Sequence, residues 1–324
     1  MRIELFDPWD DGVAPEYVAF TLANTVDEWP EGHVATGAHL LTCLRHCSAI
    51  HRKVLWLARD GGEIVGTAEA QWWEAEDNRD RAYLHPVVAP HADPDAVLPA
   101  LVAAAAESLE PLGRNVLLVE ARSGGAVSTW AQARGGRVGS VEQHNVARLA
   151  SLPLADVRAW AAAPPPGYEL LAFDGDCPDE HLEAYTRLMD TMNDAPRDDL
   201  TNEDWVYTPD RVRDYERGLR DRGHTMWTVV ARSVDTGEFA AFNQLVLMPE
   251  WPDVIENEDT AVAVPHRGHG LGLYVKSVNL LRALGSPASV VSTWNAASNT
   301  HMLRVNRALG FVCETEWDVV ETTL

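Results

Sequence analysis

The sequence is poor in cysteine and in basic residues, and it has no long apolar run. Its 324 residues include 4 cysteines, too few and too scattered for a disulfide framework. No apolar stretch approaches the roughly 18 residues of a membrane-spanning helix. The opening segment MRIELFDPWDDG lacks the charged and then apolar pattern of a signal peptide. These absences predict a reduced, cytoplasmic protein with no membrane partner.

Acidic residues far outnumber basic ones. Lys and Arg total 26 against 49 Asp and Glu, which gives a formal net charge of -23. Binding to nucleic acid or to anionic lipid requires clusters of Lys and Arg, so this balance argues against both partners. The charge suits a cationic substrate such as an amine, and it equally suits a surface that serves solubility alone.

A proline-rich segment divides the chain into two parts of domain size. A length of 324 residues suits two domains of about 150 residues each. The segment AAAPPPG (residues 161–167) has three consecutive prolines, which exclude helix and strand and form a stiff spacer. We therefore expect domains over residues 1–160 and 168–324, joined by a linker at residues 161–167.

The same order of elements is predicted on both sides of this linker. A β-hairpin comes first, then an apolar strand ending in Pro-His, then a helix, and then a further strand. Corresponding positions lie at a nearly constant offset, which predicts an internal duplication. The hairpins are expected at Lys53–Gln71 and Trp227–Leu247, the helices at Ala96–Leu109 and Leu271–Leu284, and the further strands at Asn115–Glu120 and Ala288–Thr293.

The helix expected at Leu271–Leu284 has an amphipathic pattern. Apolar residues recur at helical spacing from Leu271 onward and define one buried stripe. The same pattern places Lys276, Asn279 and Arg282 on the solvent side.

The segment VPHRGHGLG (residues 264–272) carries the clearest chemical signal. Its three glycines let a ligand approach the backbone closely, and Arg267 adds a permanent cation. A helix that starts here offers unpaired N–H groups and the positive end of its dipole, which favour phosphate. The spacing fits neither the P-loop nor the dinucleotide-binding fingerprint. The segment is therefore expected to bind an anion at a strand-to-helix turn.

This R-x-x-G-x-G turn resembles the coenzyme A loop of the GNAT superfamily of acyltransferases. The later segment NTHMLRVNRALGF (residues 299–311) resembles that superfamily's next motif, and MNDAPRDDL (residues 192–200) is similar to an uncharacterised bacterial group of tandem GNAT proteins. The resemblance implies an α/β (α+β) fold of two tandem GNAT domains. Each would have a mixed, mostly antiparallel central sheet flanked by helices.

The resemblance also implies which residues bind the cofactor. Acetyl-CoA would serve as the acyl donor, and no metal is implied. Backbone N–H groups at the end of the strand would hold the pantetheine arm, and the loop and helix start would hold the pyrophosphate. The positions that match are Val262, Ala263, Val264, Arg267, Gly268, His269, Gly270, Leu271, Gly272 and Asn299.

The first copy of the loop has the opposite chemistry. Its sequence is APHADPDAV (residues 89–97), in which Asp93 and Asp95 replace two of the glycines and Pro94 removes an N–H donor. Two carboxylates would repel a pyrophosphate, and both residues are typical of helix caps. We expect residues 1–160 to form a degenerate GNAT-like domain that does not bind coenzyme A.

In the resembled enzymes an amine attacks the thioester directly in a ternary complex, after a base has taken a proton from the ammonium. The segment ENEDT (residues 256–260) supplies Glu258 and Asp259 as candidate bases, with Glu256 beside them. Strand alternation places Glu256, Glu258 and Thr260 on one face and Asp259 on the other. The alternative is that this acidic run is a solvated strand entry.

Asn306 occupies the position where the resembled enzymes commonly carry the tyrosine that protonates the departing thiolate. An asparagine amide can hydrogen-bond sulfur but cannot give up its proton. Three alternatives follow: another group acts as the acid, the thiolate leaves with the help of solvent, or the site is slow.

These observations predict an acetyl-CoA-dependent N-acetyltransferase that acts on a small-molecule primary amine. The alternative from another class is a non-catalytic acyl-CoA sensor or interaction module, and a lesser alternative is an enzyme like mycothiol synthase. A homodimer is compatible with the sequence. The stripe Cys43, His46, Cys47 and His51 lies along one predicted helix, which cannot easily surround a tetrahedral ion, so we expect no metal site.

Overall fold

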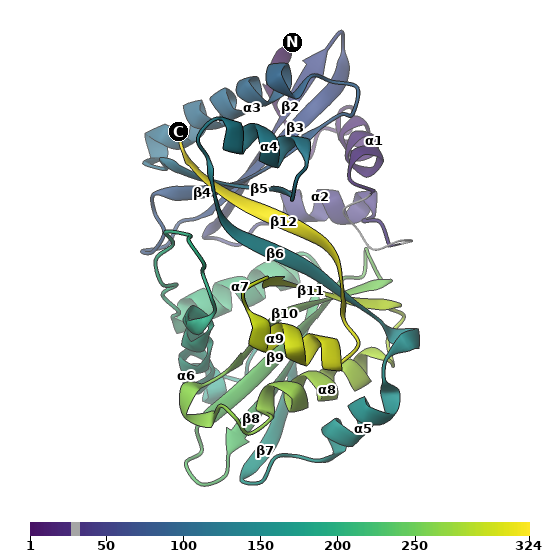
Figure 1. Cartoon of the computed structure of the whole chain (residues 1–324), viewed down its shortest axis with the longest axis vertical. Coiled ribbons are helices and arrows are strands. Elements are labelled where there is room, and N and C mark those ends of the chain that lie inside the picture. The colour runs from purple at the N-terminus through teal and green to yellow at the C-terminus, as the bar shows by residue number, and fades with distance from the viewer. Residues whose placement is uncertain (27–32) are drawn as a thin grey trace. The chain divides into compact units, whose positions relative to one another are not determined.

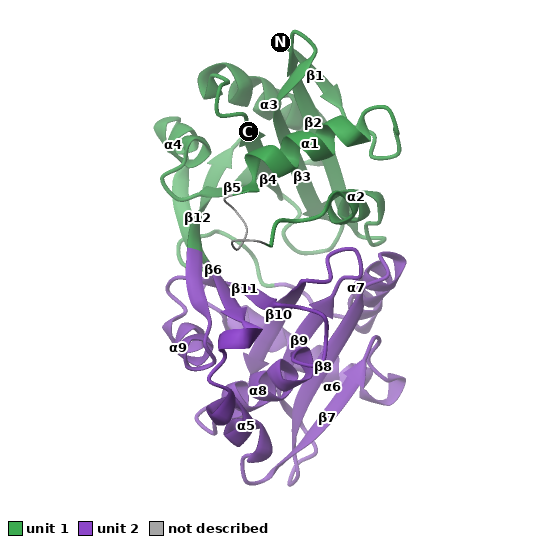
Figure 2. Ribbon diagram, turned by 90° about the vertical axis from the view of Figure 1, so that its right-hand side faces the viewer, with its two compact units in different colours: residues 1–143, 197–204, 315–324 green, residues 144–196, 205–314 purple. Residues whose placement is uncertain are grey.

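A computed structural model describes residues 1–26 and 33–324 as two compact units. Unit 1 comprises residues 1–143, 197–204 and 315–324, and unit 2 comprises residues 144–196 and 205–314 (Figure 2). Residues 144–160, expected in the first domain, lie in unit 2, and residues 315–324 lie in unit 1. Within the described ranges, every helix is too short or too polar to cross a bilayer.

Unit 1 is built on a mixed, mostly antiparallel sheet (Figure 1). Neighbouring strands are antiparallel except for β4 and β5, which run parallel and are connected through a helix. The strands are β1 (Arg2–Leu5), β2 (His51–Asp60), β3 (Glu63–Trp73), β4 (Arg81–Val88), β5 (Val116–Arg122) and the end of β12 (Val312–Thr323).

Helices cover both faces of the unit 1 sheet. Along β2, Trp56 and Ala58 pack in one apolar cluster with α3, whereas Leu55 and Leu57 pack in another cluster with α1. This division follows from the two-residue period of a strand. The helices are α1 (Ala14–Asn24), α2 (Gly37–Arg45), α3 (Pro94–Leu109) and α4 (Ala126–Ala133).

Unit 2 repeats this plan. Its neighbouring strands β7 to β10 are antiparallel, and β10 and β11 run parallel around α8. The strands are β7 (Tyr168–Asp174), β8 (Thr225–Ser233), β9 (Phe239–Leu247), β10 (Val254–Val262), β11 (Val290–Ala296) and the end of β6 (Arg137–Arg148). The helices are α5 (Leu154–Ala162), α6 (Asp179–Met189), α7 (Pro209–Asp221), α8 (Leu271–Ala283) and α9 (Thr300–Ala308).

The layers of unit 2 also follow strand alternation. Val229 and Ala231 of β8 pack with α8 on one face, and Val230 packs with α6 and α7 on the other. Hairpin, strand, helix and strand therefore recur in the predicted order in both units. The proline-rich segment at residues 161–167 begins with the last two residues of α5 and leads to β7.

The prediction that Lys276 and Asn279 face solvent is wrong. Their exposed fractions are 1% and 0%, and Arg282 is half-buried in an ion pair with Asp174. The reason is that both side chains point toward the sheet. Lys276 donates to Asn257 of β10, and Asn279 donates to Asn243 of β9, so the sheet-facing side of α8 is partly polar and the apolar stripe alone does not mark it.

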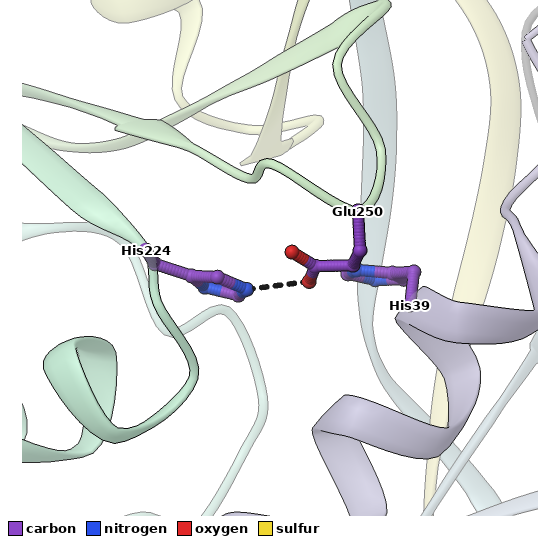
Figure 3. Close-up of side chains that lie close together, drawn as sticks. All are labelled: His39, His224 and Glu250. Atoms are coloured by element: carbon purple, nitrogen blue, oxygen red, sulfur yellow. Dashed lines mark hydrogen bonds and ion pairs between the residues drawn. The ribbon is translucent and has the colours of Figure 1, made fainter.

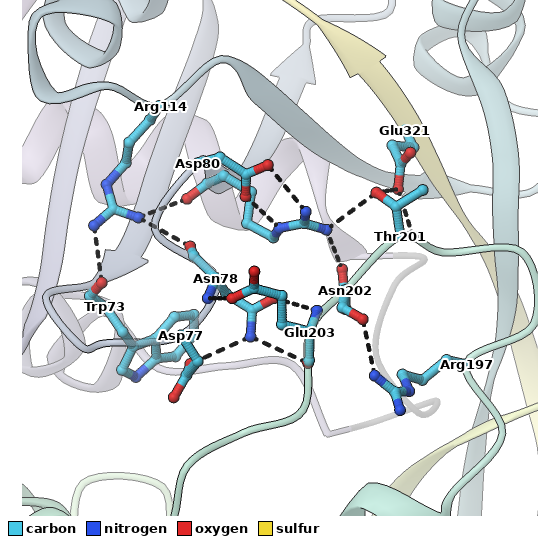
Figure 4. A network of polar contacts seen from close by, with 11 residues as sticks. Trp73, Asp77, Asn78, Asp80, Arg114, Arg197, Thr201, Asn202, Glu203 and Glu321 are labelled. Atoms are coloured by element: carbon cyan, nitrogen blue, oxygen red, sulfur yellow. Dashed lines mark hydrogen bonds and ion pairs between the residues drawn. The ribbon is translucent and has the colours of Figure 1, made fainter.

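Residues 197–204 are held in unit 1 by a dense polar network (Figure 4). The Asn78 side chain accepts from the backbone N–H of Glu203 and donates to its carbonyl, while the Asn78 N–H donates to the Glu203 carboxylate. Buried Arg81 donates to the side chain of Asn202 at 2.7 Å. Buried Arg114 donates to the carbonyl oxygens of Trp73, Asn78 and Arg81 and so holds the β3–β4 connection in place.

Asn78 adopts φ 49°, in the left-handed region that asparagine tolerates better than most residues. We expect Asn78→Ala to lower the free energy of unfolding of unit 1 by about 2–3 kcal/mol, because it loses three side-chain hydrogen bonds, two with Glu203 and one with Asp77, and because alanine tolerates this region less well than asparagine. Asn78→Gly loses the same bonds without the steric cost and should lose less. Chemical denaturation measures both, and equal losses would contradict the assigned strain.

Candidate active site

One extra residue interrupts β10 at the centre of unit 2. The pairing of β10 with β9 runs from Asn257 opposite Leu245 to Thr260 opposite Asn243, so three steps on β10 match two steps on β9. Glu258 and Asp259 of β10 together lie opposite a single residue of β9, Gln244. This is a β-bulge, which re-aims the side chains around it.

The bulge corrects the predicted alternation. The Asn243 amide donates to Asn257 Oδ1 at 2.9 Å and to Thr260 Oγ1 at 2.8 Å, so Asn257 and Thr260 lie on the same face. Asn257 also bonds Lys276 of α8, so that face is the one covered by α8. Thr260 therefore does not share a face with Glu256 and Glu258 as predicted.

The carboxylates of the bulge lie next to tyrosines of α6 and α7. The Tyr215 hydroxyl of α7 hydrogen-bonds Glu258, and burial, with the charges of Glu258, Asp259 and Glu256 added, raises the pKa of Tyr215. Burial and then the charge of Asp259 raise the pKa of the Tyr185 hydroxyl. Glu258 and Asp259 therefore both lie in the region of Tyr215 and Tyr185.

These carboxyls hold their protons more tightly than ordinary ones. Burial, with the neighbouring Glu258 charge second, raises the pKa of Asp259 from 3.8 to about 7. Burial also raises the pKa of Glu258, against the lowering effect of Arg222, although the Glu258 side chain keeps access to solvent. A carboxyl whose pKa lies near neutrality is suited to accept a proton at pH 7.

β10 and β11 separate just before the bulge. Their parallel pairing covers Val254 to Glu256 against Val290 to Ser292, and beyond it the Thr293 hydroxyl donates to the Asn257 carbonyl. On the other edge of β10 the Ala263 N–H donates to Ala240 of β9 at 2.9 Å. The Ala263 donor is thus used within the sheet.

The Val262 carbonyl points away from β9, since it accepts from Arg267 Nε at 3.0 Å. The backbone N–H and C=O of one residue in an antiparallel pair point to the same side, and successive residues alternate. The N–H of Val262 is therefore directed to the edge from which β11 has separated. Of the predicted residues Val262 and Ala263, only Val262 presents its donor there.

The loop after β10 is open and lacks a cap. A 3₁₀ turn at Val264–His266 leads to Gly268 and Gly270, whose φ angles are 84° and 75°. A Cβ at either glycine would meet nothing within 4 Å. Among the described residues, no side chain caps the N-terminus of α8 at Gly270, so its first N–H groups lack a side-chain acceptor from that part of the chain. Gly272, in the first turn of α8, would place a Cβ at 3.5 Å from Val262.

Three side chains of this loop contact neighbouring residues. Arg267 binds the Val262 carbonyl and forms an ion pair with Asp194 at 2.7 Å, with about half of each side chain exposed. His266 Nδ1 lies 3.0 Å from the Tyr168 hydroxyl, and the ring of exposed His269 lies 5.8 Å from the Tyr168 ring. Both Arg267 and His269 therefore border the loop where the sequence predicted them.

The corresponding turn of unit 1 is closed by its own carboxylates. Asp93 caps α3 by accepting from the Asp95 N–H at 3.0 Å, and the Asp95 side chain pairs with Arg134 at 2.9 Å. The predicted capping role of Asp93 is confirmed. The helix end that is open in α8 is occupied in α3.

The two asparagines of the later motif have structural partners. Asn299 caps α9 by accepting from the Met302 N–H at 3.2 Å. Asn306 is fully buried, its amide donates to Asn295 at 2.6 Å, and its Oδ1 has no partner. As placed, the Asn306 amide is committed to a neighbour.

A buried pair joins the segments that flank the hairpin. His224 lies just before β8, and its Nε2 lies 2.6 Å from Glu250, in the connection between β9 and β10 (Figure 3). Burial lowers the pKa of His224 more strongly than the Glu250 carboxylate raises it. This contact supports the start of β10.

Several site residues could not be identified from motif spacing. Tyr215 follows Val212 at three residues in α7 and matches the pattern of a core residue. Asn243 and Gln244 are consecutive polar residues in the otherwise apolar, buried strand β9. Two polar residues in such a strand were the signal that could have pointed to the site. Lys276 and Asn279 were missed because they were placed on the solvent side.

Comparisons with known proteins identify the fold. No family model matches the sequence, and no curated protein matches it either. Among solved structures, a tandem GNAT protein from the clavulanic acid biosynthesis pathway, solved without AcCoA, matches with a TM-score of 0.80 and 22% identity, covering 99% of this chain and 98% of that one. A GCN5-related N-acetyltransferase from Sphaerobacter thermophilus matches with a TM-score of 0.70 and 15% identity, covering 99% and 95%.

A putative acetyltransferase from Pyrococcus horikoshii also matches, with a TM-score of 0.59 and 11% identity over 100% of this chain and 89% of that one. The chain therefore has the tandem GNAT fold. The predicted α/β fold class, with mixed sheets flanked by helices, is confirmed.

The pKa of Asp259 predicts a pH-dependent stability. The folded protein keeps this proton to about pH 7, whereas the unfolded chain loses it near 3.8, so the folded state binds more protons between these values. The contribution of Asp259 to stability therefore falls as pH rises through this window. We expect Asp259→Asn to gain stability relative to the parent protein between about pH 4 and pH 7, and the gap to level off above. Thermal unfolding of both proteins across this range measures the difference in their stability. A difference that does not change with pH would contradict the pKa assigned to Asp259.

Proposed function

We propose that the protein is an acetyl-CoA-dependent N-acetyltransferase that acts on a small primary amine by direct transfer in a ternary complex. The observation that carries this proposal is the course of β10. Within a few residues this strand separates from β11, presents two carboxyls of raised pKa, and runs into an uncapped helix end. The tandem GNAT fold supports an acyltransferase in general.

The donor would lie along the end of β10 and the start of α8. The first N–H groups of α8, together with Gly268 and Gly270, provide donors and positive dipole for a pyrophosphate. Arg267 adds a cation, already oriented by the Val262 carbonyl. The N–H of Val262, directed toward the separation from β11, is placed to bind the pantetheine arm or the thioester carbonyl.

The acceptor would lie on the α6 and α7 side of the sheet. Glu258 and Asp259 approach Tyr215 there, and Ser292 of β11 pairs with Glu256, so Trp294, two residues on, lies on this same face. The Trp294 side chain is 45% exposed. Carboxylates and an exposed indole both attract a cationic amine.

In the proposed reaction Asp259 or Glu258 takes a proton from the substrate ammonium. The amine nitrogen then attacks the thioester carbon and a C–N bond forms. The nitrogen gives its second proton to solvent, and the C–S bond breaks. Coenzyme A leaves as a thiolate and takes up a proton from solvent, because the Asn306 amide, which is engaged with Asn295, cannot give up its proton.

One observation favours the alternative of a non-catalytic acyl-CoA-binding protein. Asn306 stands where a proton donor is expected, and it is fully buried with its amide engaged. Calorimetry with acetyl-CoA, combined with an assay of free thiol release over a panel of primary amines, separates the two. Binding with amine-dependent release supports the transferase, and binding without release from any amine supports the sensor.

A substitution at Gly270 tests the donor site. We expect Gly270→Asp to weaken acetyl-CoA binding at least about 100-fold, because it places a carboxylate at the helix end, as Asp93 does in unit 1. Gly270→Asn is the matched control, since it has the same shape and tolerates the φ of 75° but carries no charge. Calorimetry on both variants measures the difference. Equal affinity in the Asp variant and the parent protein would contradict the assigned site.

A further inference from the structure

Lys276 is an unusual residue for this chain. The 26 basic residues comprise 24 arginines and 2 lysines, Lys53 and Lys276. Lys276 lies in α8 with an exposed fraction of 1%. Within residues 1–26 and 33–324 no carboxylate pairs with its ammonium nitrogen, which lies 5.2 Å from the centre of the Phe311 ring. A buried lysine without an ion pair is costly, so a role beyond packing is indicated.

The one hydrogen bond of Lys276 leads to the bulge. Its Nζ donates to Asn257 Oδ1 at 2.9 Å, and the Asn257 amide donates to the Glu258 carbonyl at 2.9 Å. Lys276 thus orients the side chain that binds the backbone between the two candidate bases. The path from Lys276 to the carbonyl of Glu258 has a single intermediate residue.

Further amides hold the same bulge from the α8 face. Asn243 donates to Asn257 and to Thr260, one residue on each side of the bulge. Asn279 donates to Asn243 Oδ1 at 2.9 Å, and the Thr293 hydroxyl donates to the Asn257 carbonyl. Lys276 and these residues form what we call the bulge network: Asn243, Asn257, Thr260, Lys276, Asn279 and Thr293.

The network explains why a lysine serves at this position. Arginine keeps its charge under all physiological conditions, whereas a lysine amine can release its proton when buried. Burial lowers the pKa of Lys276 from 10.5 to about 7. The groups that face it are the Asn257 amide oxygen and the Phe311 ring, so a neutral amine fits and can still donate to Asn257.

We propose that Lys276 is a positioning residue for acyl transfer, which acts through Asn257 to fix the β10 bulge and so to aim Glu258 and Asp259. The expected loss of kcat rests on the proposed function. The positioning of the bulge by Lys276 rests on the contacts of the bulge network alone. Lys276 does not reach the proposed acceptor, because it lies on the α8 face while the carboxyls lie on the α6 and α7 face. Its exposed fraction of 1% also closes it off from the donor proposed at the start of α8.

The test uses Lys276→Met, which keeps the length and loses the donor. We expect kcat to fall by about 100-fold, since small displacements of a reacting group have effects of this size. Acetyl-CoA affinity should change by less than about twofold, because the Arg267 to Gly272 loop is untouched. Ser277→Ala is the matched control, since this neighbouring hydroxyl is equally buried and bonds only the Leu273 carbonyl of its own helix. It should leave kcat unchanged.

A double-mutant cycle separates positioning from general destabilisation. If Lys276 acts through Asn257, the loss from Lys276→Met should nearly vanish in an Asn257→Ala background. Additive losses, or an unchanged kcat in a folded Lys276→Met variant, would overturn the proposal. Should Lys276→Met fail to fold, Asn257→Ala alone should still show the selective fall in kcat, and an unchanged kcat there would overturn it equally.

A readout without turnover keeps this inference distinct from the proposed function. Carbon-13 NMR of the Asp carboxyls, assigned with Asp259→Asn, follows the titration of Asp259. We expect Lys276→Met or Asn257→Ala to lower its midpoint, because the carboxyl leaves its enclosed position. If the parent protein transfers no acetyl group to any amine, only the proposed function is contradicted. If neither variant changes the titration midpoint of Asp259, the inference about Lys276 is contradicted.

Discussion

The separation of β10 from β11, together with the extra residue in β10, is the constraint on which the rest of the site depends. A regular strand would satisfy its backbone groups with both neighbours and would send Glu258 and Asp259 to opposite faces. Here the pairing with β11 ends at Glu256, and the bulge follows at once. The edge proposed to bind the donor, the pair of carboxyls and the direction of the chain into α8 all follow from these few residues.

Unit 1 shows the same architecture without the extra residue. Its β4 also ends the pairing with β5 early, at Leu84 opposite Val119, although β4 continues to Val88. The pairing of β3 with β4 runs from Gly66 opposite Val88 to Gln71 opposite Tyr83 without a shift in register. The helix that follows β4 is capped by Asp93. The bulge and the open helix end are therefore both missing from unit 1 and both present in unit 2. This joint occurrence is expected if the two features serve one reaction, because each alone would leave either the donor or the acceptor without a site.

The features that the sequence predicted are those encoded by short-range chemistry. Glycine spacing around Arg267 indicated a turn whose backbone a ligand can approach, and Asp93 followed by proline indicated a helix cap, since such signals act within a few residues. The order of elements along the chain followed from repeated patterns, and the fold class followed from the resemblance of the loop and the later helix motif to the GNAT superfamily. The bulge was missed because alternation assumes a regular strand, and nothing in ENEDT marks where one residue is left out of the pairing. Lys276 was missed because burial by several elements at once depends on tertiary packing.

The bulge network also limits how this site can vary. A bulge leaves backbone groups without ladder partners, and in a buried strand these groups need side-chain partners. Asn257 meets this need for the Glu258 carbonyl, but its own Oδ1 then requires donors, which Asn243 and Lys276 supply. Each polar residue thus creates the requirement for the next, so loss of one member leaves a buried group unsatisfied. A site of this kind keeps its geometry only while the whole set is complete, which is why a lysine far from the substrate face can control the carboxyls on it.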